Sequence, residues 1–164
     1  MARTHTTYDS PIGRLTLVAA DGELCGLYFP DHRHPPAAVD LGAAATKGFE
    51  PVEAQLAEYF AGERHSFELG TVLAGGSGFQ RRVWSRLASI PYGETTTYGE
   101  IAAELGDGAG AREVGAAVGR NPISVIVPCH RVVGKDGALT GYAGGLERKR
   151  HLLELESPAA QLTL

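Results

Sequence analysis

Apolar and polar residues alternate along two neighbouring segments near the start of the chain. The alternation over residues 14–20 predicts a half-buried strand, and residues 23–29 predict a second one. Asp21-Gly22 between them is typical of a type I′ hairpin turn. Because strand side chains alternate between two faces, one face of the second strand is expected to carry Cys25, Leu27 and Phe29. Cys25 is therefore interpreted as a small buried hydrophobic residue.

A helical spacing of apolar residues follows over residues 51–61. Pro51 suits the first turn of this helix and Gly62 suits its end. The run Leu73–Gly78 is rich in glycine and is the clearest linker in the chain. We place a domain boundary there, with an N-terminal β-rich domain over residues 1–76 and a C-terminal domain over residues 77–164. The first domain shows no recognisable chemistry, and its His32 and His34 lack a third metal ligand nearby.

Beyond this boundary the apolar spacing becomes that of helices. A stripe of apolar residues predicts a helix from Phe79 to Ile90. Thr97 and Glu100 then fit a capping box, in which Thr97 accepts from the amide of Glu100 and the carboxylate reaches back. A short helix to Leu105, a glycine-containing turn and a second short helix over about 110–119 make a helix-turn-helix signature.

The second of these short helices has unusually small side chains. Its small residues are Ala111, Gly115, Ala116, Ala117 and Gly119. Each glycine costs a helix about 1 kcal/mol relative to alanine, so the sequence indicates that something approaches this backbone closely. Tight packing on a neighbouring helix and approach to a nucleic-acid groove both remain open. Arg112 is the one long basic side chain in its first two turns.

A thiol and an imidazole follow a further apolar run. Ile123–Val127 is predicted to form a strand that leads through Pro128 to Cys129 and His130. A free thiol has a pKa of about 8.5 and needs a base to react at neutral pH, and histidine, oriented by a carboxylate, is the usual base. Neighbouring residues of an extended chain point to opposite sides, so contact between the two side chains would need a water or a bend. A glycine-rich loop over 140–145 and a last helix over 146–156 complete the chain.

Composition narrows the class of protein. The 164 residues carry a net charge of −4, with 21% charged and 43% hydrophobic residues, which excludes a wholly basic nucleic-acid binder and a disordered chain. The acidic excess lies in residues 1–77, with 5 Lys+Arg against 10 Asp+Glu, whereas residues 78–164 carry 10 against 9. Two cysteines make neither a disulfide framework nor a four-cysteine zinc site. No segment has the length of a membrane span or the form of a signal peptide, so we expect a cytoplasmic location.

Several segments together resemble one family. In chain order they are 90–95, Tyr98, Ala111-Arg112, 119–122, Pro128–Val132 and 141–146, with a weaker match at Asp9–Gly13. They resemble the methylated-DNA–protein-cysteine methyltransferases, or 6-O-alkylguanine-DNA alkyltransferases, strongly over about residues 79–156. The resemblance implies an α/β fold of two small domains. The first would be a ribonuclease H-like β-sheet domain, and the second a mainly helical, winged helix-turn-helix domain.

The resemblance also implies a reaction. Cys129 would take the alkyl group from 6-O-alkylguanine, with 4-O-alkylthymine as a second candidate substrate, in one irreversible turnover without a cofactor or a metal. His130 would deprotonate Cys129 through a water, Glu156 would orient His130, and Asn121 would link the recognition helix to the active-site strand. Tyr98 would crowd the phosphate of the flipped nucleotide and protonate the leaving base.

The implied partner is the minor groove of double-stranded DNA, with no membrane and no obligate protein partner. Arg112 would fill the gap left by the flipped base, and the other implied DNA-binding residues are Thr97, Tyr98, Ala111 and Gly115. The base pocket would be lined by Val132, Tyr142, Ala143 and Gly144. Ala143 departs from the serine or charged residue of several members, and Glu156 lies near the end of the sequence. Because no zinc-binding domain precedes the match, we expect no promoter-activating role.

Three alternatives predict different features. A damage-binding protein of the alkyltransferase-like kind would lack the acceptor cysteine, and Cys129 argues against it. A plain helix-turn-helix regulator would carry basic side chains along its recognition helix for major-groove contacts, where this chain has alanine and glycine. A Cys-His-Glu hydrolase would turn over many times, would need an oxyanion site and would need no DNA.

Overall fold

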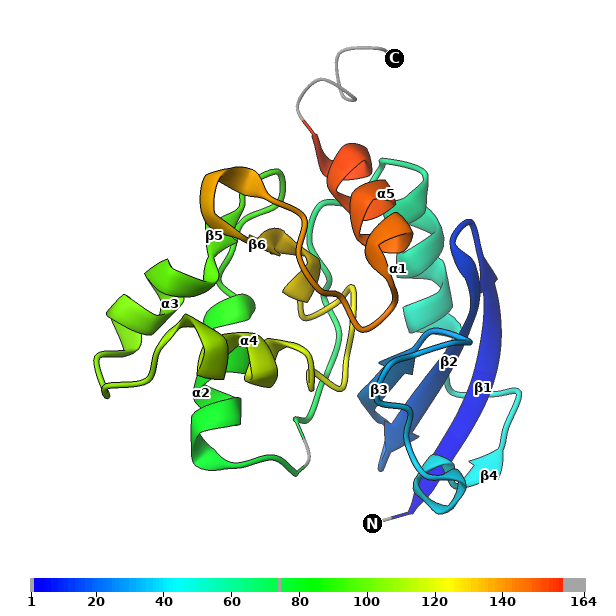
Figure 1. Ribbon diagram of the computed structural model, residues 1–164. Helices are drawn as coiled ribbons and strands as arrows, with labels where there is room; N and C mark the ends of the chain where they lie inside the picture. The colour runs from blue at the N-terminus through cyan, green and yellow to red at the C-terminus, as the bar shows by residue number, and fades with distance from the viewer. Residues whose placement is uncertain (1, 74, 158–164) are drawn as a thin grey trace.

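Four strands of the N-terminal half form one mixed sheet (Figure 1). In the computed structural model, which describes residues 2–73 and 75–157, the strands are β1 (Arg3–Ser10), β2 (Gly13–Ala20), β3 (Glu23–Tyr28) and β4 (Ala43–Ala44). Their order is β3-β2-β1-β4, with β4 parallel to β1 and the other pairs antiparallel. The predicted hairpin is confirmed by β2 and β3. β1 was not predicted, because its residues are mostly polar and half-buried and do not alternate in hydropathy.

A β-bulge corrects the predicted face of the second strand. Val18 pairs with Gly26, but Ala19 pairs with Leu24, so Cys25 is the extra residue on β3. The additional residue reverses the alternation. Cys25 is buried as expected, but it lies with Val18 and Ala20 in a small cluster, whereas Leu27 and Phe29 belong to the main core. The prediction that Cys25 shares a face with Leu27 and Phe29 was therefore wrong.

The segment between the two halves lies between the helices α1 and α2. α1 (Glu50–Phe60) has Pro51 in its first turn as predicted, and the chain leaves it through Gly62 with a φ of +80°. α2 (Gly78–Leu87) begins with a capping box, in which Ser77 Oγ accepts from Gln80 N at 3.1 Å and Gln80 Oε1 accepts from Ser77 N at 2.8 Å. It ends at Leu87 and not at Ile90, although Ile90 is buried. Ala74, within the predicted linker, lies outside the described residues.

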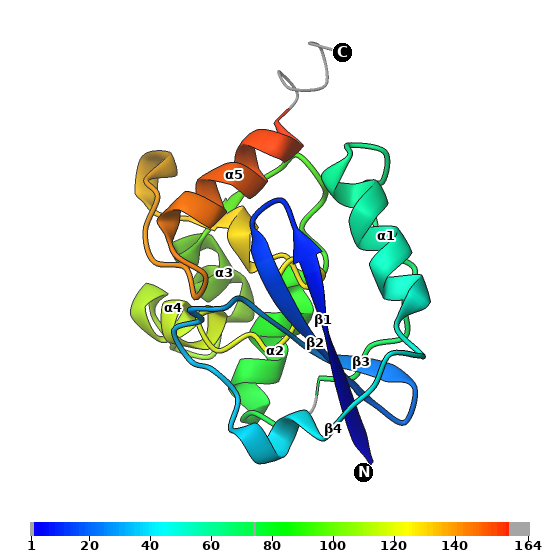
Figure 2. The ribbon, with the colours of Figure 1, turned by 90° about the vertical axis from the view of Figure 1, so that its right-hand side faces the viewer.

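The predicted helix-turn-helix is formed by α3 (Tyr98–Leu105) and α4 (Ala111–Val118). Thr97 caps α3 by accepting from the amide of Glu100 at 3.1 Å. The carboxylate of Glu100 accepts from the Thr96 hydroxyl at 2.7 Å instead of returning to the Thr97 amide, so only half of the expected capping box is present. Figure 2 shows the sheet in front of α2, α3 and α4.

The remaining elements surround the Cys-His segment. They are β5 (Thr96–Thr97), the 3₁₀ turn η2 (Cys129–Arg131), β6 (Val132–Val133), which runs parallel to β5, and α5 (Leu146–Glu156). Two further 3₁₀ turns are η1 (Ala38–Leu41) and η3 (Lys135–Gly137).

The predicted strand Ile123–Val127 is not formed. Ile123 makes an isolated bridge with Leu27, and the chain then turns, with Val125 at a φ of +72°. The Asn121 side chain closes this turn, because its Nδ2 donates to Val127 O at 2.8 Å and its Oδ1 accepts from Ile123 N at 3.1 Å. A tight loop and a 3₁₀ turn therefore present Cys129, where the sequence predicted a strand end.

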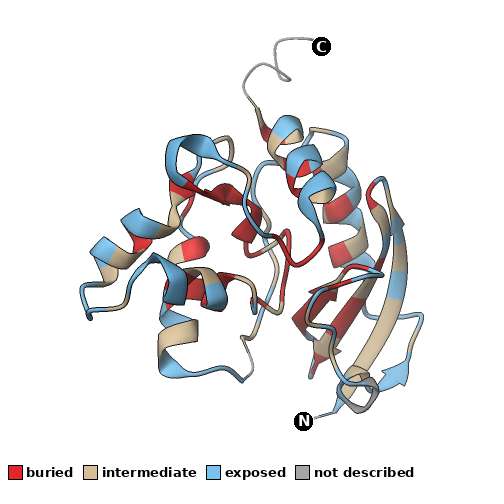
Figure 3. Ribbon diagram, viewed as in Figure 1, coloured by how far each residue is buried: buried red, intermediate tan, exposed pale blue. Residues whose placement is uncertain are grey.

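Both halves contribute to the main core. Its buried residues include Leu15, Leu17 and Leu27 from the sheet together with Leu87, Ile123 and Leu152 from the helical half. Figure 3 shows the buried residues gathered on β2, β3 and the segment from α4 to β6, where the halves meet. The backbone crosses this junction, since Leu27 N donates to Pro122 O at 2.9 Å. None of the described helices is long and apolar enough to cross a bilayer.

Candidate active site

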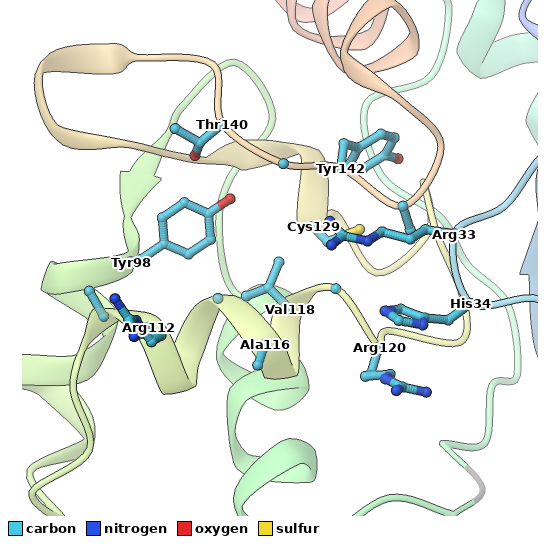
Figure 4. Close-up of a pocket in the computed structure, with 15 residues that line it drawn as sticks. Arg33, His34, Tyr98, Arg112, Ala116, Val118, Arg120, Cys129, Thr140 and Tyr142 are labelled. Atoms are coloured by element: carbon cyan, nitrogen blue, oxygen red, sulfur yellow. The ribbon is translucent and has the colours of Figure 1, made fainter.

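Cys129 lies at a cavity of about 650 Å³ between α4, Tyr98 and the loop 140–143 (Figure 4). The cavity is lined by Arg33, His34, Tyr98, Ala111, Arg112, Gly115, Ala116, Val118, Gly119, Arg120, Cys129 and residues 140–143. In Figure 4, Tyr98 and Arg112 lie on one side of it, and His34 and Arg120 on the other. This volume lies within the range of small-molecule sites in proteins.

The thiol is held in a buried, polar setting. Cys129 is 2% exposed, and burial raises the pKa of its thiol above the ordinary value. Contacts from the side chains of Asn121 and Ser124 and the positive charge of Lys149 act in the opposite direction. The resting group is therefore a thiol that needs a base, in surroundings that stabilise its anion once the proton has left.

His130, the residue that follows Cys129, is completely buried and is oriented by Glu156. Its Nε2 lies 2.8 Å from Glu156 Oε2, and its buried Nδ1 has no hydrogen-bond partner among the described residues. An Nε2–H donated to the carboxylate leaves Nδ1 with a free lone pair, which is the form of a general base. Burial lowers the pKa of His130, and Glu156 opposes this effect.

Arg131 keeps Glu156 charged. Its Nε donates to Glu156 Oε1 at 2.8 Å and its Nη2 to Oε2 at 2.9 Å, while its Nη1 donates to Ile90 O at 2.6 Å. Burial alone would raise the pKa of Glu156, but hydrogen bonds from His130 and Arg131 bring it to about 2. The carboxylate that orients His130 is thus ionised throughout the physiological range.

Lys149 is a buried cation of the site that was not predicted from the sequence. Its Nζ donates to Thr140 O at 2.8 Å and to Gly141 O at 3.2 Å, and it lies 3.4 Å from Tyr98 Oη. Burial lowers the pKa of Lys149 to about 8. Lys149 lies three residues before Leu152 and seven before Glu156, so all three are on one face of a helix. This spacing is the signal in the sequence from which the burial of Lys149 could have been predicted.

Arg33 and His34 bring the N-terminal half to the same cavity. Both residues lie in the loop after β3, and Arg33 N donates to Ala143 O at 2.8 Å. No chemistry was predicted for this half, because no spacing in the loop marks these residues as part of a site. Only the packing of the sheet against loop 140–145 brings them there.

The residues predicted from the resemblance fall into three groups. Tyr98, Ala111, Arg112, Gly115, Cys129, Tyr142 and Ala143 line the cavity. Asn121, His130, Val132 and Glu156 are buried, and Val132 does not line the cavity as was predicted. Thr97 and Gly144 do not line the cavity: Thr97 caps α3, and Gly144 packs against Phe29, whose ring would overlap an added Cβ. Among the described residues, no three His, Cys, Asp or Glu side chains are placed to hold a metal ion.

Three of the small residues of α4 are on its open side. Ala111 and Ala116 are exposed, as is Arg112, and Gly115 is half-buried, whereas Val114 and the small residue Ala117 pack inward. The glycine at 115 is not required by a neighbouring helix, since an added Cβ would meet only Tyr98 at an ordinary 3.7 Å. Of the two interpretations of this helix, its geometry favours close approach by a ligand.

Two family models match the chain. The model described as "6-O-methylguanine DNA methyltransferase, DNA binding domain" matches residues 78–158, and the one described as "6-O-methylguanine DNA methyltransferase, ribonuclease-like domain" matches residues 4–72. The chain belongs to this family. The predicted two-domain α/β fold and the resemblance are thereby confirmed.

Relatives of the 6-O-methylguanine DNA methyltransferase family match along nearly the whole chain. The methylated-DNA–protein-cysteine methyltransferase of Mycolicibacterium paratuberculosis is 50% identical over 98% of this chain and 97% of its own length. The crystal structure of Mycobacterium tuberculosis O6-methylguanine methyltransferase superposes with a TM-score of 0.85 at 45% identity, covering 99% of this chain and 99% of that one. Mycobacterium tuberculosis OGT in complex with DNA gives a TM-score of 0.85 at 47% identity, covering 96% and 97%.

Proposed function

We propose that this member of the family repairs DNA by moving an alkyl group from 6-O-alkylguanine in a duplex to Cys129, irreversibly and once per molecule. The observation that carries the proposal is a buried thiol at an open cavity, backed by His130 and the ionised Glu156. A relative named methylated-DNA–protein-cysteine methyltransferase supports the reaction, and a related structure in complex with DNA supports the partner. Because the acceptor is a thiol, the compartment must be reducing, and we propose the cytoplasm.

The side chains at hand can supply every proton of this reaction. The Cys129 proton passes through a water to His130 Nδ1, and the sulfur attacks the alkyl carbon as its bond to the guanine 6-oxygen breaks. The guanine anion takes a proton from the Tyr98 hydroxyl, and Lys149 stabilises the resulting phenolate. A thioether remains on Cys129. Since the electron pair and both protons come from the protein and the substrate, no cofactor is required.

We propose that α4 enters the minor groove and that Arg112 fills the gap left by the flipped base. The open side of α4 carries small residues, so the DNA backbone can come close. Arg112 is exposed at the rim of the cavity, where a long cation can reach the base stack. Extrusion of a damaged, poorly paired base costs less of the few kcal/mol that flipping normally requires.

The proposal is tested by the mass of the intact protein after incubation with a duplex that carries one 6-O-methylguanine. We expect one added methylene per molecule, mapped to Cys129, with no further gain in excess DNA. Cys129→Ala should gain nothing, and Cys25→Ala, a matched change of the other buried thiol, should behave as wild type. Tight binding without a mass gain would make the protein a damage binder. A second duplex with 4-O-methylthymine tests the other substrate.

The role of Arg112 is tested separately. Arg112→Ala should slow transfer from the duplex by about tenfold or more, because the gap in the stack is no longer filled. It should not change the rate at which iodoacetamide modifies Cys129, since Arg112 lies at the rim and not at the thiol. Equal loss in both assays would show that Arg112 acts on the thiol and not on the DNA.

A further inference from the structure

A tyrosine of the N-terminal half touches the carboxylate that orients His130. The Oη of Tyr59, from α1, donates to Glu156 Oε2 at 2.5 Å across 97 residues of sequence. The Tyr59 side chain is fully buried, and its ring is in edge or tilted contact with Phe60, Phe67 and Tyr92. Figure 1 shows α1 and α5, the two helices joined by this bond, next to each other.

We propose that Tyr59 is a positioning residue of the alkyl-transfer site, which sets how strongly Glu156 pairs with His130. The inference rests on the proposed function, because it concerns the proton path from Cys129. It also gives the N-terminal half a part in the chemistry, although none of the reacting atoms belongs to that half.

One oxygen of Glu156 accepts hydrogen bonds from three side chains. Glu156 Oε2 accepts from Tyr59, from His130 at 2.8 Å and from Arg131 Nη2 at 2.9 Å, whereas Oε1 accepts from Arg131 Nε. Hydrogen bonds donated to a carboxylate in a dry interior withdraw its charge. Tyr59 therefore competes with His130 for the same lone pairs and weakens the pull of Glu156 on the imidazole.

This competition favours the neutral imidazole. An ionised carboxylate stabilises the imidazolium form of His130, so less charge on Oε2 leaves the ring less basic. The other charged groups that act on His130 are Arg131 and Lys149. The positive charges of Arg131 and Lys149 also lower the pKa of His130. Tyr59 acts in the same direction as these cations, and the imidazole stays ready to accept the Cys129 proton.

Tyr59 is suited to this role because its hydroxyl keeps its proton. Burial and the neighbouring Glu156 raise the pKa of Tyr59 well above its ordinary value. Throughout the range in which His130 titrates, the phenol is therefore a neutral donor. Phenylalanine at this position would keep the ring contacts and remove only the donated hydrogen bond, and Glu156 Oε2 would retain two donors.

The test compares Tyr59→Phe with Tyr28→Phe, a change of a half-buried tyrosine on β3. The rate of methyl transfer from a 6-O-methylguanine duplex is measured under single-turnover conditions from pH 5 to 9. We expect Tyr59→Phe to move the acid limb of the profile to higher pH by about one unit, because His130 becomes more basic. The plateau rate should stay close to that of the wild type, and Tyr28→Phe should not move the limb. An unmoved limb, or one moved to lower pH, would overturn the proposal.

A second readout does not depend on DNA. The titration of His130 is followed by NMR of protein labelled in histidine, with the resonance assigned by its loss in His130→Gln. Its midpoint should rise in Tyr59→Phe, while the other histidines titrate as in the wild type. A lower melting temperature with an unchanged midpoint would show a purely structural role and would contradict the inference. Failure of the wild type to gain a methylene would instead reject the proposed function.

Discussion

The N-terminal sheet domain and the C-terminal helical domain contribute different kinds of atoms to one candidate site. The C-terminal half supplies the thiol, imidazole, carboxylate and ammonium, on η2 and α5. The N-terminal half supplies mainly supports: the amide of Arg33 on Ala143 O, the ring of Phe29 against Gly144 and the hydroxyl of Tyr59 on Glu156. Reacting groups can be recognised in a sequence by their chemistry, whereas supporting atoms gain their meaning only from the fold.

The largest effect on the transfer rate is expected at Lys149, which belongs to the C-terminal half that supplies the reacting groups. Lys149→Met keeps the unbranched length but removes the charge that favours the Cys129 thiolate and the donor to Thr140 O. We expect the transfer rate to fall by about 100-fold, as for the loss of one preorganised electrostatic group. Lys135→Met, at an exposed lysine, is the matched control. A Lys149→Met protein that transfers at the wild-type rate would remove Lys149 from the site.

The same lysine should give stability a characteristic pH dependence. The pKa of Lys149 is about 8 in the folded protein, against an ordinary value of 10.5 for a solvated lysine. Between these values the unfolded chain binds more protons, so stability rises with pH. Below pH 8 the cost of burying the charge is fully present. The free energy of unfolding of the wild type should therefore rise relative to Lys149→Met between about pH 8 and 10.5, by on the order of 3 kcal/mol. Parallel curves from denaturant titrations at these pH values would contradict this.

Gly144 tests the contact between the two halves directly. A Cβ at Gly144 would overlap the Phe29 ring, so Gly144→Ala must displace the loop that carries Tyr142 and Ala143. We expect a loss of about 1–3 kcal/mol in unfolding free energy, with slower transfer. Gly141→Ala, in the same loop, meets open space and should unfold as the wild type does. If the two variants had equal stabilities, the packing of the loop on the sheet would not matter.

The sequence predicted the parts of the fold that local patterns govern. The β2–β3 hairpin and the α3–α4 pair were predicted because turn residues and apolar spacing agree there. The strand at Ile123–Val127 was wrong because the Asn121 side chain closes a turn, and a side-chain bond of this kind leaves no periodic signal. The predicted face of Cys25 on β3 was wrong because a single-residue bulge shifts the alternation of side chains. Such a bulge depends on the pairing with the neighbouring strand.

The candidate site shows the same difference between features that a local pattern predicts and features that depend on long-range contacts. Cys129 and His130 could be recognised from their chemistry, and the resemblance brought in Tyr98 and Glu156. Tyr59 was predicted only to lie within the helix over residues 51–61, because its bond to Glu156 spans 97 residues and leaves no local signal. Contacts of this kind depend on how the sheet packs on the helices, which no single segment encodes.

Arg148 tests the polar part of the junction, with a smaller expected effect. Its Nε donates to Ile12 O at 2.7 Å, its Nη1 donates to Gly144 O at 3.0 Å, and its guanidinium lies over the Phe29 ring. Arg148→Met should therefore lower the free energy of unfolding by about 1–2 kcal/mol. It should also increase hydrogen exchange in residues 141–146. Arg150→Met, at an exposed position of α5, is the control and should change neither measurement.

The smallest effect is expected at Asp31, which pairs with Arg148 but is much more exposed than Arg148. Arg148 Nη1 also pairs with Asp31 Oδ1, and the side chain of Asp31 is 74% exposed. Exposed ion pairs contribute little, because water and salt screen them. Asp31→Asn should leave the melting temperature and the transfer rate close to those of the wild type, at low and at high salt. A loss as large as that of Arg148→Met, and weaker in high salt, would show that the ion pair holds the halves together. A negligible change would assign that role to the carbonyl oxygens of Ile12 and Gly144.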